Sequence, residues 1–158
     1  STGIAHTLSG IERLARAVEQ AGGWPSAEAL DTYDRAVRRE LRFIDTLVAT
    51  CYAALPSFRA WRAATMLYFA AATTEERRRT RGGPTPDAPF ARGFLSAHDD
   101  ALYEITADAY RHLAEAPSSE TAAADFERFV ESAIAPYNEV GLFDPPAPNM
   151  YPHTAALV

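Results

Sequence analysis

Residues 33–56 read YDRAVRRELRFIDTLVATCYAALP and carry the clearest secondary-structure signal of the chain. Its apolar residues recur every three or four positions, which is the spacing of one face of an α-helix. Pro25 and Ser26 precede it as helix-start signals, and Pro56 ends it. The members of the apolar stripe are Tyr33, Val37, Leu41, Ile44, Val48, Cys51 and Tyr52. The stretch therefore predicts a long amphipathic helix with this stripe on its apolar face.

Four further segments show the same periodicity, and we expect no β-strand. The first spans about residues 4–20, ends before Gly22 and Gly23, and carries the stripe Ile4, Leu8, Ile11, Leu14, Ala15 and Val18. The expected caps of the others are Ser57, then Ser96 in the capping-box-like sequence SAHD, then Ser118 or Ser119. Residues 80–93 are rich in glycine and proline and predict a loop. The fold class is all-α, with about five helices and an extended, proline-rich C-terminal tail.

Composition narrows the class of protein. A chain of 158 residues fits one domain, and 47% hydrophobic with 23% charged residues is typical of a globular protein. No apolar run approaches the roughly 18 residues of a membrane span, so we expect no membrane partner. A net charge of -6 disfavours nucleic acid as a partner. The one cysteine, Cys51, is expected to be a packed core thiol in a reducing cytoplasm.

Several sequence features are candidates for a cofactor, partner or metal site. Neither G-x-G-x-x-G nor the P-loop pattern occurs, so this chain alone is not expected to bind a dinucleotide or to be active. The arginine run 77–79 is expected to be a solvated helix end. Four potential ligands share one helix face, but a helical di-metal site needs Glu-x-x-His pairs, so no metal is predicted. These four are Asp100, Glu104, Asp108 and His112.

Two other features are candidates for binding. Trp61, Tyr68 and Phe69 share a helix face that either packs in the core or lines a pocket for an aromatic ligand. Ser1-Thr2-Gly3-Ile4 places unpaired backbone N–H groups at a helix N-terminus, which either is an ordinary cap or binds an anion. Because the chain opens on Ser1 at the edge of a helix, we expect further protein upstream.

Both ends of the chain resemble one family. Residues 1–15, STGIAHTLSGIERLA, resemble the segment after the Asp-Pro-Leu element of FAD-dependent halogenases and their monooxygenase-like relatives. Residues 134–138 (IAPYN), 141–142 (GL), 144–145 (DP) and 149–152 (NMYP) are similar to a stretch near the C-terminus of some members. The halogenase motif Trp-x-Trp-x-Ile-Pro and the catalytic lysine would lie upstream, and this chain has no lysine.

The resemblance implies part of a flavoprotein oxidoreductase. FAD would be bound mainly by an upstream FAD-binding domain or chain, with Ser1, Thr2, Gly3 and Ile4 bordering the flavin and Thr2 and Gly3 offering N–H groups to a halide. Residues 1–20 would continue from that domain, with part of their apolar stripe facing it. Residues 21–136 would form a substrate-side domain whose walls include Trp61, Tyr68 and Phe69, and residues 137–158 would pack over it as a tail.

The reaction and the class of protein stay open at this point. Halogenation, hydroxylation and dehydrogenation of a small-molecule or carrier-tethered aromatic substrate are all compatible with the resemblance. A non-enzymatic helical protein-interaction module and a metal-dependent helical oxygenase are the alternatives.

Overall fold

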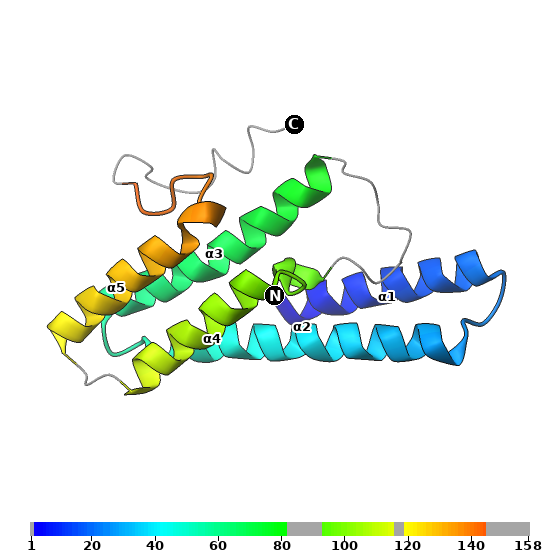
Figure 1. The fold of residues 1–158 in the computed structure, drawn as a ribbon, viewed down its shortest axis with the longest axis horizontal. Coiled ribbons are helices and arrows are strands. Elements are labelled where there is room, and N and C mark those ends of the chain that lie inside the picture. The colour runs from blue at the N-terminus through cyan, green and yellow to red at the C-terminus, as the bar shows by residue number, and fades with distance from the viewer. Residues whose placement is uncertain (1, 82–92, 116–118, 145–158) are drawn as a thin grey trace.

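The computed structural model describes residues 2–81, 93–115 and 119–144, and the regular structure in these ranges is helical throughout (Figure 1). The predicted all-α class with five helices is thereby confirmed, whereas residues 145–158 of the expected tail lie outside the described ranges, as does Ser1. None of the described helices is long and apolar enough to cross a bilayer. The elements are α1 (Thr2–Ala21), α2 (Ala27–Ala53), α3 (Phe58–Thr80), the 3₁₀ turn η1 (Phe94–Ser96), α4 (Asp100–Glu115), α5 (Glu120–Ile134) and η2 (Ala135–Tyr137).

Serine caps set three of the helix starts. The hydroxyls of Ser26, Ser57 and Ser119 each accept a hydrogen bond from the backbone amide three residues later. This satisfies an amide that the helix itself leaves unpaired. The predicted caps of α2, α3 and α5 are confirmed.

The predicted capping box before α4 is wrong. The carboxylate of Asp99 accepts from the amide of Leu102 at 3.1 Å, so Asp99 caps this helix. Ser96 is fully buried in η1, and its hydroxyl donates to Glu75 at 3.4 Å. Leu95 and Ser96 have φ angles of 53° and 61°, in the left-handed region that non-glycine residues rarely adopt. This left-handed turn shifts the start of α4 toward the C-terminus.

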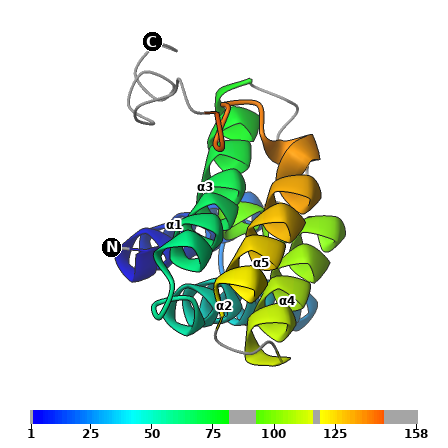
Figure 2. The same ribbon diagram turned by 90° about the vertical axis from the view of Figure 1, so that its left-hand side faces the viewer.

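Helices α2 to α5 form a bundle in which α3 packs on α5 and α2 packs on α4 (Figure 2). The buried face of α3 consists mainly of alanines, whose small side chains let the neighbouring helices approach closely. Larger side chains from α2 and α5 fill the centre, with Phe43, Leu47 and Phe126 all at most 1% exposed. The core thus sits between α3 and the other three helices.

The buried side of α2 differs from the stripe that periodicity predicts. Phe43, Leu47 and Thr50 face the core, whereas stripe members Leu41 and Tyr52 are 45% and 70% exposed. The helix carries apolar residues over more than half of its circumference, and packing against α3 and α4 selects only one side. Of the stripe, Ile44 and Cys51 pack partly against the core, and Tyr33 contacts α1, where its hydroxyl donates to the Gly10 carbonyl at 3.2 Å.

Helix α1 lies along the first half of α2, joined to it by a short turn (Figure 1). Its buried residues are His6, Gly10, Arg13 and Ala17. Three of its large aliphatic residues, Ile4, Leu8 and Ile11, are 64%, 61% and 59% exposed, whereas Leu14 and Val18 are half-buried. The first three turns of α1 therefore turn polar side chains toward the bundle and apolar side chains away from it. We call Ile4, Leu8 and Ile11 the outer stripe.

Candidate functional site

Glu40 on α2 is the centre of a buried polar cluster that joins three elements. Its side chain is 1% exposed. Arg13 donates from its two terminal nitrogens to the two carboxylate oxygens at 2.5 and 2.6 Å. The ring of His6 lies 2.9 Å from one oxygen, and the backbone amide of Phe94 donates to the other at 3.0 Å. The carboxylate is therefore held by α1 and η1 together.

This cluster fixes the rotation of α1. A buried charge is costly unless it is paired and hydrogen-bonded, and Glu40 meets both conditions only when His6 and Arg13 face inward. His6 also contacts the ring of Phe94 edge-on, with the ring centroids 5.4 Å apart. Because these inward residues occupy one side of α1, the outer stripe on its opposite side points to solvent.

The first turn of α1 brings together two of the predicted site residues. The Thr2 hydroxyl lies 2.8 Å from the Tyr68 hydroxyl of α3, a hydrogen bond across 66 positions of sequence. The Tyr68 ring meets Phe69 edge-on at 6.0 Å. A Cβ added at Gly3 would have no atom within 4 Å, so the space around this turn is open. Ile4 follows on the outer stripe.

Thr2 and Gly3 lie in the first turn of α1, and the first backbone N–H groups of a helix have no partner within it. Thr2 and Gly3 are therefore the described residues that could contact a cofactor here. A pyrophosphate needs a longer glycine-rich cradle, which this sequence lacks.

The predicted aromatic wall divides in the structure. Tyr68 reaches Thr2, Phe69 packs against the core, and Trp61 is 38% exposed with its ring beside Phe58. Seven residues separate Trp61 from Tyr68, which is about 10 Å along a helix. Tyr68 and Phe69 thus lie near the start of α1, whereas Trp61 lies nearer the α2–α3 turn.

The acidic face of α4 is used for ion pairs and packing. Asp100 accepts from Arg39 at 2.5 Å, Asp108 pairs with Arg111, and the His112 ring contacts the rings of both Phe126 and Phe129. Within residues 2–81, 93–115 and 119–144, no three His, Cys, Asp or Glu residues are grouped as a metal site.

Cys51 packs against the core from the side of α2. Burial raises the pKa of its thiol, which favours the unreactive protonated form.

A second polar cluster was missed at the sequence level. Arg78 donates to Asp99 at 2.8 Å, and the Tyr137 hydroxyl donates to the other oxygen of Asp99 at 2.9 Å. Burial and then this hydrogen bond raise the pKa of Tyr137 to about 12. Burial alone would raise the pKa of Asp99, but the hydrogen bonds from Arg78, the Leu102 amide and Tyr137 outweigh it and lower that pKa.

The arginine run is therefore more than a solvated helix end. Arg77 and Arg81 both contact Glu139, which follows η2, while Arg78 holds the start of α4. The residues just after η2 also contribute to the core, since Val140 and Leu142 are buried. The end of α3 ties two chain segments to the bundle.

Comparison of the chain with protein-family models, curated protein sequences and solved structures gives no match. Function is therefore inferred from three features: the resemblance of the two chain ends to FAD-dependent halogenases, the contact between Thr2 and Tyr68, and the outer stripe.

Proposed function

We propose that the chain is the helical, substrate-side portion of an FAD-dependent halogenase-like oxidoreductase, and that α1 forms its seam with an upstream FAD-binding domain or chain. The observation that carries this proposal is the orientation of α1. Buried Glu40 holds the polar side of α1 inward, and the outer stripe is left facing solvent.

The outer stripe supports a seam at this place. A surface helix normally buries its apolar side and exposes its polar side, whereas the first turns of α1 bury His6 and Arg13 and leave Ile4, Leu8 and Ile11 exposed. Contiguous apolar residues on a surface mark interaction sites. Residues at spacings of four and three lie in line along one helix face, so Ile4, Leu8 and Ile11 offer a partner one continuous strip.

The start of α1 supports a position beside the flavin. Its first N–H groups carry the positive end of the helix dipole, which suits a halide or negative charge on the ring. The bound flavin would supply the redox chemistry. This chain would contribute contacts from Thr2 and Gly3, with Tyr68 holding the Thr2 side chain in place.

The substrate we propose is aromatic, either a small molecule or one tethered to a carrier. Tyr68 and Phe69 lie close to the start of α1 and would form the nearest wall of its pocket, while Trp61 would be more distant. Pockets of this type are mostly apolar with a few placed polar groups. We also propose a cytoplasmic setting, which the single, half-buried thiol of Cys51 supports.

The test uses the protein produced with the proposed FAD-binding region. Leu8→Asp places a charge in the seam and should strongly reduce the amount of flavin that copurifies. The matched control is Leu41→Asp, at a comparably exposed leucine of α2. Equal flavin content in the two variants, or no flavin with the unaltered protein, would overturn the proposal.

Gly3→Val tests the flavin-side assignment separately. A β-branched side chain would crowd the space that the structure leaves open at Gly3, so turnover should fall strongly. Unfolding by denaturant should change little, because a Cβ at Gly3 would have no described atom within 4 Å apart from its chain neighbours and its own helix backbone. Unchanged turnover would leave the start of α1 as an ordinary helix end.

A helical interaction module without a flavin is the second candidate. Tyr52, Leu55 and Phe58 at the α2–α3 turn are 70%, 59% and 75% exposed, and they form a further apolar surface for a protein partner. Copurification of a protein partner whose binding depends on these residues, with no flavin in any preparation, would favour the module.

A further inference from the structure

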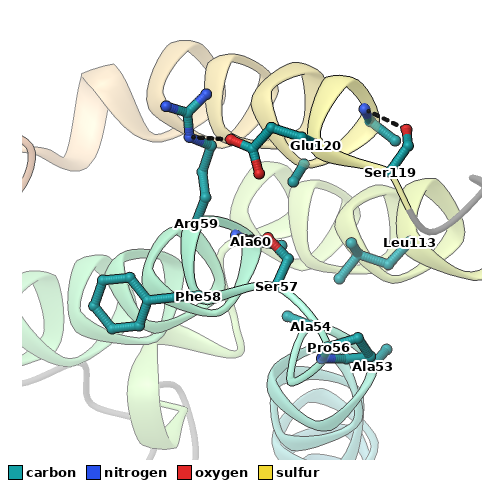
Figure 3. Close-up of a pocket in the computed structure, with 12 residues that line it drawn as sticks. Ala53, Ala54, Pro56, Ser57, Phe58, Arg59, Ala60, Leu113, Ser119 and Glu120 are labelled. Carbon is teal, nitrogen blue, oxygen red and sulfur yellow. Dashed lines mark hydrogen bonds and ion pairs between the residues drawn. The ribbon is translucent and has the colours of Figure 1, made fainter.

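A cavity of about 560 Å³ opens at the end of the bundle where the α2–α3 turn meets the start of α5 (Figure 3). The end of α4 contributes Leu113 to its wall. The volume lies within the range of sites for small organic molecules. No residue assigned above to the flavin side lines this cavity.

The floor of the cavity is apolar and made of small side chains. Ala54, Ala60 and Ala123 are 1%, 3% and 5% exposed and come from α2 or its end, α3 and α5. A methyl group cannot reach across the space between three helices, so the floor stays open. Pro56 and Leu113 extend the apolar surface along the walls.

The rim supplies a few polar groups whose charges are balanced. Arg59 and Glu120, the two charged residues of the lining, pair at 3.3 Å (Figure 3), and Glu127 outside the lining pairs with both Arg59 and Arg62. The hydroxyls of Ser57 and Ser119 accept the amide hydrogens of their own helices. A hydroxyl that accepts in this way keeps its own proton for donation, so each serine can also bond a ligand oxygen.

We propose that this cavity binds a small, uncharged aromatic molecule that carries a hydroxyl or carbonyl group. The apolar floor suits an aromatic ring, the paired rim charges do not favour an ionic ligand, and the serine hydroxyls suit a single oxygen. Eleven residues of α3 and its cap separate Ser57 from Tyr68, or about 16 Å along a helix. This site is thus distinct from the proposed flavin side and does not depend on it.

The experiment titrates the chain with 2-naphthol, which has two rings and one hydroxyl. We expect a dissociation constant below about 1 mM, with amide chemical-shift changes concentrated at residues 53–60 and 119–123. Ala122→Trp and Ala53→Trp fill the cavity from two sides and should each weaken binding at least about tenfold, a change of about 1.4 kcal/mol. Ala101→Trp, at an exposed alanine of α4 outside the cavity, should bind as the unaltered chain does.

Circular dichroism checks that each variant is folded. If Ala122→Trp does not fold, Ala53→Trp alone tests the proposal, because Ala53 is solvent-exposed and tolerates a larger side chain. Absence of binding at about 1 mM would overturn the proposal. Equal affinity in the filled and control variants would overturn it, and so would shift changes centred on the outer stripe.

Discussion

Replacing Glu40 with glutamine tests whether the buried cluster holds α1 in place. Glutamine keeps the shape of the side chain but removes the charge, so Arg13, itself only 8% exposed, loses its carboxylate partner. Breaking a buried ion pair by changing one partner costs about 3–5 kcal/mol, because the remaining charge stays buried without the carboxylate that balanced it. Docking of α1 should weaken by about that amount.

The loss should first be visible in α1. This helix packs mainly on α2, whereas α2 to α5 hold one another, so α1 can detach while the bundle stays folded. Hydrogen exchange should show faster exchange of residues 2–21 in Glu40→Gln with little change in α3 and α5. Urea unfolding followed by circular dichroism gives the total change in the free energy of unfolding.

Glu12→Gln is the matched control. Glu12 lies on α1 and bonds Arg16 at 2.5 Å, but both side chains are about half exposed. Exposed pairs of this spacing contribute about 0.3–0.5 kcal/mol. If Glu40→Gln destabilised α1 no more than Glu12→Gln does, the buried cluster would not fix the rotation of α1. The explanation for the exposure of the outer stripe would then be wrong.

Three further predictions concern packing, backbone and pH. Leu67→Ala should lower the free energy of unfolding by about 2–5 kcal/mol, whereas Leu8→Ala should change it by less than about 0.5 kcal/mol, because Leu67 is 0% and Leu8 61% exposed. Ser96→Gly should be more stable than Ser96→Ala by about 1 kcal/mol, since both remove the hydroxyl but only glycine adopts a φ of 61° without strain. The lowered pKa of Asp99 means that its stabilising contribution is complete above the unfolded carboxyl pKa of about 4 and is lost as pH falls through the folded value. Asp99→Asn should therefore show a smaller loss of stability between neutral and acid pH in denaturant melts, and an unchanged pH profile would count against the cluster with Tyr137.

The helices and most of their boundaries follow from the sequence because they depend on local signals. Periodicity marks the helices, serines at positions 26, 57 and 119 cap three of them, and Pro56 and Pro136 follow the ends of α2 and α5. The predicted start of α4 is wrong because Ser96, although its residue type is common at helix caps, lies in a left-handed turn stabilised by tertiary contacts. Such a turn depends on neighbours distant in sequence.

Which face of a helix is buried was harder to predict. In α2, Phe43 and Leu47 form the core, while the stripe members Leu41 and Tyr52 are exposed, and either side satisfies a helical period. For α1, the missed signal is a second set of residues, His6, Gly10 and Arg13, which has the same three- and four-residue spacing as the apolar stripe. Its partner Glu40 lies 27 positions after Arg13, so nothing local connects them.

Two of the predicted site residues lie in contact. The contact between Thr2 and Tyr68 joins a residue chosen from the family resemblance with one chosen from aromatic spacing. The cluster of Arg78, Asp99 and Tyr137 could not be predicted, because its members come from three segments and each has an ordinary role on its own.

Hydrogen exchange of α1, with and without the proposed FAD-binding region, tests the seam most directly. In the chain alone, residues 2–10 should be among the least protected helical amides, since their outer side has no cover and α1 packs mainly on α2. With the FAD-binding region present, the same amides should become strongly protected while those of α5 stay unchanged. Strong protection of residues 2–10 in the chain alone, or no increase in their protection when the FAD-binding region is present, would contradict the proposed seam.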